Sequence, residues 1–324
     1  MTDQPPIVIL TALELEYRAV RDHLTGLRDE TPVSGTLFET GTLRGGGEVV
    51  LAVTGPGTHG TAIIAERAIR VFAPRAVLFA GIAGSLKPAV RLGDIVVATH
   101  VYAYHGAAAR PAGLSSRPRV WEIDHALDQI ARRVARRIAG DGPVPGDDAD
   151  RPVVHFGPVA SGEVLHDARV SDPLRWIRRH YDDALAIEME AAGVAKAGHL
   201  GLAPVAVIRA ISDRADGTKA ATDGSGGQDL AAQQAARFAL ALAAEIPAGR
   251  AATEPTGGRA EPTGGRAEPT GGRAEPTGGR AAPQTHVETH GGSHGAVAGV
   301  IYGGVHNDTR PVRPNRPASE DGGW

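Results

Sequence analysis

Carboxyl side chains follow three short apolar runs of this sequence. Glu16 comes after the run IVIL, Glu190 after ALAI, and Asp213 after VAVIRAI. Each run is predicted to be a buried strand, and a carboxyl group beside an apolar sheet loses hydration, which raises its pKa. One such group could stay protonated and donate a proton while another accepts one, which is the chemistry of glycosidic bond cleavage. A single carboxylate at a strand end is more often a cap, so the prediction rests on the three together.

The elements that must position these carboxyls alternate between strands and helices. Apolar runs predict strands at 7–10, 36–42, 48–53, 76–80, 94–99, 153–160, 184–188 and 205–211, and helical spacing predicts helices at 14–24, 61–72, 121–139, 191–198 and 230–246. The glycine-rich stretch 81–85 is predicted to be a loop. This order predicts a three-layer α/β/α domain, residues 1–246, with a mixed and largely parallel central sheet. Polar residues at strand ends are then the first place to look for a site.

Composition and charge exclude several classes of function. The chain has 324 residues with 34 Lys and Arg against 37 Asp and Glu, so no net field would attract nucleic acid or an anionic membrane. It contains no cysteine, which excludes disulfides, thiolate metal sites and a cysteine nucleophile. A signal peptide and a stretch of about 18 apolar residues are both lacking, so a cytoplasmic protein is expected.

A different composition begins at residue 247. Residues 247–285 contain four consecutive copies of EPTGGRA, whose proline and paired glycines exclude a stable coiled coil and indicate a spacer. Residues 286–308 contain the β-prone, uncharged run AVAGVIY, and residues 309–324 are predicted to be disordered. The run resembles bacterial amyloid signalling motifs, which stack as cross-β and would pair with an amyloid-type partner. The alternatives are an inert low-complexity tail and a metal-binding role for its histidines.

Five segments give the first domain a family resemblance. They are IVILTALELEY, FAGIAGSLKPAVRLGDIVVA, VASGEV, AIEMEAAGVAKAG and VAVIRAISDRAD. Their order and spacing resemble the nucleoside phosphorylase/nucleosidase superfamily. The chain resembles the 5′-methylthioadenosine/S-adenosylhomocysteine nucleosidases more than the phosphorylases, because Glu16 stands where the former carry the base that activates water. The loop 55–60 is glycine-rich, yet no arginine accompanies it, so it is interpreted as a turn and helix start rather than a phosphate site.

The resemblance implies catalytic roles for two carboxyls. Asp213 would donate a proton to N7 of adenine, with Ser212 orienting its carboxyl group. Glu16 would deprotonate the water that attacks C1′ of the ribose. This hydrolysis needs neither a metal nor a cofactor. A homodimer is also expected from the resemblance alone.

The resemblance also implies a set of substrate contacts. Glu190 would accept hydrogen bonds from the ribose hydroxyls, and Met189 would pack against the sugar. Backbone would approach the base and ribose at Gly81, Ile82, Ala83 and Gly84. For Glu188, the sequence favours neither a structural nor a functional role over the other.

One segment departs from the family pattern. Where the family has an aromatic and then an apolar residue across the adenine, this chain has Leu165 and His166. Stacking on the adenine would therefore be weaker, and the surroundings of the base would be more polar. Residues 105–119 are interpreted as an insertion. Hydrolysis of methylthioadenosine or S-adenosylhomocysteine is therefore the default expectation. The alternatives are another adenine nucleoside or nucleotide such as ATP, phosphorolysis, and a catalytically idle fold serving amyloid assembly.

Overall fold

A computed structural model describes residues 4–29, 32–111, 113–139, 151–165, 171–215 and 226–248. The predicted spacer beyond residue 248, the β-prone segment 286–308 and the tail 309–324 lie outside the described residues. The expectations for these segments therefore stay predictions.

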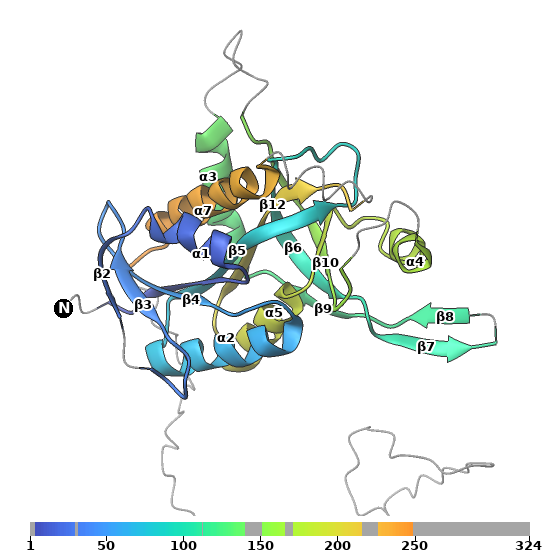
Figure 1. Ribbon diagram of the computed structural model, residues 1–324, viewed down its shortest axis with the longest axis horizontal. Helices are drawn as coiled ribbons and strands as arrows, with labels where there is room; N and C mark the ends of the chain where they lie inside the picture. The colour runs from blue at the N-terminus through green and yellow to red at the C-terminus, as the bar shows by residue number, and fades with distance from the viewer. Residues whose placement is uncertain are drawn as a thin grey trace, which may run out of the picture. The chain divides into compact units, whose positions relative to one another are not determined.

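One sheet of ten strands forms the centre of the described part of the chain (Figure 1). Its strand order is β11-β10-β6-β12-β5-β1-β4-β3-β2, with β9 paired to β6. The central strands β4, β1, β5 and β12 run parallel, whereas β12 and β6 pair antiparallel, so the sheet is mixed. The strands are β1 (Ile7–Thr11), β2 (Thr25–Asp29), β3 (Glu39–Thr42), β4 (Glu48–Val53), β5 (Ala76–Ser85), β6 (Ile95–Ala103), β9 (Arg119–Glu122), β10 (Val154–Ser161), β11 (Ala186–Glu188) and β12 (Val205–Asp213).

Helices cover both faces of this sheet (Figure 1). One face packs against α1 (Glu14–Arg21), α3 (His125–Ala139) and α7 (Gly227–Glu245), and the other against α2 (Thr58–Phe72) and α5 (Ala191–Gly201). Alternate residues of β1 enter the two cores, with Ile7 and Ile9 on one side and Val8 and Leu10 on the other. Both faces of a strand are thus buried, which explains its continuous apolar run. The predicted three-layer α/β/α fold is confirmed.

Two further elements lie beside the layers. The supposed insertion at 105–119 contains a hairpin of β7 (Ala107–Arg110) and β8 (Gly113–Ser116). Tyr181, which follows helix α4 (Asp172–His180), anchors this hairpin, since its Oη lies 2.5 Å from Ser116 Oγ. Sequence patterns predicted neither element, nor the strands β2 and β9. The helix predicted at 121–139 begins only at His125, because Trp121 and Glu122 pair with β6 as part of β9.

The predicted loop at 81–85 is wrong. Strand β5 continues to Ser85, because Ala206 to Ile211 of β12 keep pairing with it and β11 joins its end antiparallel at Gly84 and Ser85. Glycine often marks a strand where another group approaches the backbone closely, and such an approach occurs here in the site described below.

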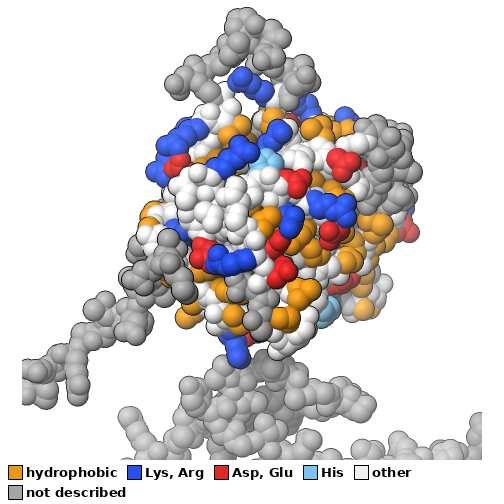
Figure 2. All heavy atoms as spheres, turned by 60° about the vertical axis from the view of Figure 1, so that its left-hand side comes forward, with side chains coloured by type: hydrophobic (Ala, Val, Ile, Leu, Met, Phe, Trp, Pro, Cys, Tyr) orange, Lys and Arg blue, Asp and Glu red, His pale blue; other side chains and the backbone are white. Residues whose placement is uncertain are grey.

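Charges of both signs mix on the surface. On the face shown in Figure 2, Lys and Arg side chains are interspersed with Asp and Glu, and neither sign forms a broad area. This agrees with the net charge of −3. Among the described helices, none is long and apolar enough to cross a membrane.

Candidate active site

The ends of β1, β5, β11 and β12 meet around a cavity of about 310 Å³. It brings together the predicted residues Glu16, Ile82, Ala83, Gly84, Leu165, Met189, Glu190, Ser212 and Asp213. Gly81 does not line it, and His166 lies outside the described residues. A larger groove of about 920 Å³ lies between β9 and the end of α5, but none of the predicted site residues lines it. Convergent polar groups, rather than volume, favour the smaller cavity as the active site.

Glu16 is held in a cage of backbone amides. Its Oε2 accepts hydrogen bonds from Ala12 N at 2.8 Å and Leu13 N at 2.9 Å, and its Oε1 accepts from Ile82 N at 2.8 Å. The carboxyl group is buried, and this desolvation raises its pKa although Arg209 and the three amides oppose the rise. Glu16 is therefore a stronger base than an exposed glutamate, and its orientation is fixed.

A β-bulge directs Asp213 into the cavity. The pairing of β12 with β5 shifts between Ile211 and Asp213, which leaves Ser212 as the extra residue. Asp213 Oδ1 accepts from Ala215 N at 2.8 Å, and Oδ2 accepts from Ser212 Oγ at 2.9 Å. A Cβ atom on Gly84 would come within 2.9 Å of Oδ1, so glycine at this position makes room for the carboxyl group.

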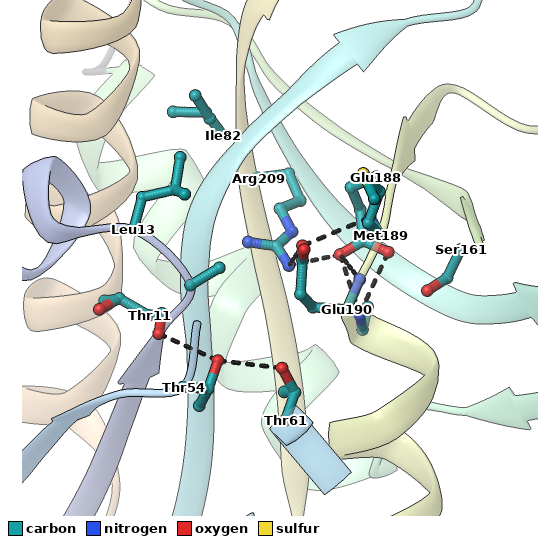
Figure 3. A network of polar contacts seen from close by, with 12 residues as sticks. Thr11, Leu13, Thr54, Thr61, Ile82, Ser161, Glu188, Met189, Glu190 and Arg209 are labelled. Atoms are coloured by element: carbon teal, nitrogen blue, oxygen red, sulfur yellow. Dashed lines mark hydrogen bonds and ion pairs between the residues drawn. The ribbon is translucent and has the colours of Figure 1, made fainter. Parts of the chain in front are cut away.

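Glu188 serves helix α5 and a buried arginine (Figure 3). Its Oε2 accepts from Ala191 N at 2.9 Å, at the start of α5, and from Arg209 Nη2 at 2.5 Å. These contacts place Glu188 in the structural role that the sequence left open, although its side chain also lines the cavity.

Arg209 is the functional candidate that sequence reasoning did not assign. It is fully buried on β12, its guanidinium lies 4.0 Å from the Phe79 ring centroid, and within the described residues its Nε and Nη1 have no hydrogen-bond partner. A Cβ on Gly81 would overlap Nη1 and lie 2.5 Å from Glu16 Oε1, so both groups crowd the same glycine. An unsatisfied buried donor beside a carboxylate is suited to binding a polar ligand such as water. A charged residue inside an apolar strand run was the sequence signal.

The surroundings of Glu190 shift the pKa of its carboxyl group. Its Oε1 accepts from Gly57 N at 2.9 Å, and its Oε2 lies 3.9 Å from Arg209 Nη2. Burial, followed by the negative charge of Glu188, raises the pKa of Glu190 to about 7. The group can thus accept or share a proton near neutral pH.

The glycine-rich loop before α2 is already occupied by carboxylates. Gly57 N donates to Glu190, and Thr58 N donates to Glu163 Oε1 at 2.9 Å. The threonines Thr11, Thr54 and Thr61 form a hydrogen-bond chain that fixes the loop to β1 (Figure 3). Because protein carboxylates hold these amides, the loop is not a ready phosphate cradle.

Carboxyl groups at strand ends, beside apolar walls and near a buried arginine with two donor atoms unbonded in the described part of the chain, define an enzyme site for a small ligand. The chain belongs to the phosphorylase superfamily, whose family model matches residues 6–246. The resemblance inferred from the sequence motifs is therefore confirmed.

Named relatives narrow the class within this family. A 5′-methylthioadenosine/S-adenosylhomocysteine nucleosidase from Anoxybacillus flavithermus is 32% identical over 210 residues, covering 64% of this chain and 84% of the relative. The ATP nucleosidase Cap17 from Escherichia coli is 31% identical over 241 residues, but the match covers only 47% of that relative and 66% of this chain. The crystal structure of the Neisseria meningitidis methylthioadenosine/S-adenosylhomocysteine nucleosidase in complex with methylthio-immucillin-A matches with a TM-score of 0.62 and 25% identity, covering 74% of this chain and 98% of that one. The chain thus lies among the N-glycosyl hydrolases of the superfamily.

Proposed function

We propose that this protein hydrolyses the N-glycosidic bond of an adenine nucleoside of the methylthioadenosine or S-adenosylhomocysteine type and releases adenine. The observation that carries the proposal is the convergence of Glu16 and Asp213 on one cavity, with Glu190 on the same lining. Two carboxyls are what an acid and base pair requires, and the two differ in their surroundings.

The geometry supports a division of roles. Asp213 donates a proton to N7 of adenine as the C1′–N9 bond breaks, so the base leaves without a negative charge. Glu16 accepts a proton from the water whose oxygen bonds to C1′. Arg209 Nη1, a buried donor without a partner in the described residues, helps to hold that water. Glu190 accepts the ribose hydroxyls, Met189 packs on the sugar, and the backbone of β5 borders the base.

The negative charge of the site favours hydrolysis over phosphorolysis. An attacking phosphate would have to approach Glu16, a buried carboxyl group, and the amides of the α2 loop already hold Glu190 and Glu163. Water carries no charge and so meets no repulsion from the Glu16 carboxylate. A nucleotide substrate such as ATP is the second candidate, and the similarity to Cap17 is the observation that favours it.

A substrate panel tests the activity. The purified protein is expected to release adenine from methylthioadenosine or S-adenosylhomocysteine, and added phosphate is expected to leave the rate unchanged because water is the nucleophile. Chromatography of adenine from these two compounds, adenosine and ATP, each with and without phosphate, measures this. Formation of a ribose 1-phosphate would establish phosphorolysis instead, and no adenine from any substrate would refute the enzyme proposal.

The biological setting is proposed from sequence features alone. A nucleosidase joined by a repeat spacer to a β-prone segment has the organisation of an effector in a bacterial immune-type signalling system. A homodimer is likewise proposed only from the family resemblance.

The β-prone segment has its own test. A peptide of residues 286–308 is expected to form fibrils that bind an amyloid dye, because its run AVAGVIY is apolar, uncharged and free of proline. The matched control carries Ile301→Pro, which removes a ladder donor and is expected to stay monomeric. A wild-type peptide that remains monomeric would contradict the signalling proposal.

A further inference from the structure

The rim of the cavity beside Glu190 is closed by a contact between the start of α2 and the end of β10. Glu163 follows β10, and its Oε1 accepts from Thr58 N at 2.9 Å. Its Oε2 would lie 3.1 Å from a Cβ on Gly57, so glycine permits this close approach. The neighbouring residues Pro56 and Val164 both line the cavity. The Glu163 carboxylate therefore stands at the rim on the side of Glu190.

Two side chains at the end of β6 fix the position of Glu163. His105 Nδ1 accepts from Glu163 N at 3.2 Å, and the Tyr104 hydroxyl accepts from the next amide, that of Val164. Tyr104 is buried, and its ring packs so closely on Gly162 that a Cβ there would overlap it. Because a buried tyrosine and its neighbour hold two consecutive amides, the backbone of Glu163 is fixed at the rim, and the bond from Thr58 N holds its carboxylate there.

The described part of the cavity is rich in acid. Glu16, Glu188, Glu190 and Asp213 line it, and Arg209 is the buried cation that pairs with Glu188. The positive end of α2 would normally attract an anion, but Glu190 and Glu163 already occupy its first amides. His59 Nδ1 lies 3.5 Å from Glu163 Oε1 and is exposed, so solvent screens it. A phosphate at the ribose end would face the Glu163 carboxylate, and the amides of Gly57 and Thr58 are already held by carboxylates.

We propose that Glu163 is a specificity-determining residue that disfavours a negatively charged 5′ substituent. The preferred substrate class is then an adenine nucleoside whose 5′ group carries no net negative charge. The inference rests on the proposed N-glycosidase function and decides between its two substrate candidates.

Adenosine and adenosine 5′-monophosphate form the test pair, because they differ only in the 5′ phosphate group, which carries the negative charge. Wild-type protein is expected to release adenine from adenosine with the higher kcat/KM. Glu163→Gln keeps an acceptor for Thr58 N but removes the charge. It is expected to raise kcat/KM for the monophosphate relative to adenosine by about fivefold, the effect of one unit charge at short range in a partly solvated site. Glu66→Gln, an exposed change on α2, the helix that the Glu163 carboxylate contacts, is the matched control and should leave the ratio unchanged.

The outcomes separate this inference from the activity itself. No adenine from this pair, nor from methylthioadenosine or S-adenosylhomocysteine, with wild-type protein would refute the proposed function. Adenine release in which Glu163→Gln leaves the substrate ratio at the wild-type value would overturn the role of Glu163 alone. If the variant does not fold, the wild-type ratio measured from low to high salt decides. Screening should reduce the preference for adenosine, and a preference independent of salt would overturn the inference.

Discussion

Asp213→Asn is expected to lower kcat for adenine release by about 10²- to 10⁴-fold while KM stays near the wild-type value. Asparagine has nearly the same shape, and its carbonyl oxygen can accept from Ala215 N, as Asp213 Oδ1 does. Its amide can still donate a hydrogen bond to N7 but has no proton to transfer. Adenine would then leave as an anion, so the loss falls on the chemical step and not on binding.

Steady-state kinetics on methylthioadenosine, together with the Kd of a bound substrate, measure this split. Ser212→Ala is the graded control, because it removes one hydrogen bond to Oδ2 but keeps the carboxyl group. Its kcat should fall far less than that of Asp213→Asn. An Asp213→Asn protein with wild-type kcat would mean that another group protonates the base.

Strand positions were predictable where both faces are buried. Strands such as β1 and β12 show continuous apolar runs, since alternate side chains enter two different cores. Strand β2 has the pattern TGLRD with only one residue partly buried, so nothing in its sequence separates it from a loop. The hairpin β7–β8 is similarly exposed, and it is held in place by Tyr181, the residue after α4.

The error at residues 81–85 has a physical cause. Two glycines within five residues are typical of a loop, but here β12 and β11 complete the hydrogen bonds of β5. Gly81 is needed because Arg209 and Glu16 come together against it. That close approach is a tertiary contact between residues far apart in sequence, so no local pattern reveals it.

In the candidate site, too, some residues could be identified from local sequence and others only from the fold. Glu16, Glu190 and Asp213 were identified because each follows a recognisable strand. The role of Arg209 depends on Glu188 and on the space above Gly81, which only the fold brings together. The occupation of the α2 amides by Glu163 and Glu190 likewise joins segments more than 100 residues apart.

Glu16→Gln is expected to abolish turnover to about the same extent as Asp213→Asn, because no base remains to take the proton of the attacking water. The substitution also disturbs the amide cage. A glutamine oxygen can replace Oε2 at Ala12 and Leu13, but its NH₂ group then faces Ile82 N, a donor against a donor. Leaving that amide unsatisfied costs about 1–3 kcal/mol of folding free energy. Thermal melts therefore accompany the kinetics, and Glu14→Gln, an exposed change on the same helix, is the matched control.

The raised pKa of Glu16 gives this prediction a pH signature. Between the ordinary glutamate pKa of 4.5 and the raised value, Glu16 is protonated in the folded protein but ionised in the unfolded chain. Its contribution to stability is therefore greatest at low pH and falls as pH rises through this window. Activity has the opposite dependence, since only the ionised carboxylate is a base. The acid limb of kcat/KM for wild type should lie above pH 4.5, and a limb at or below that pH would assign the base to another group.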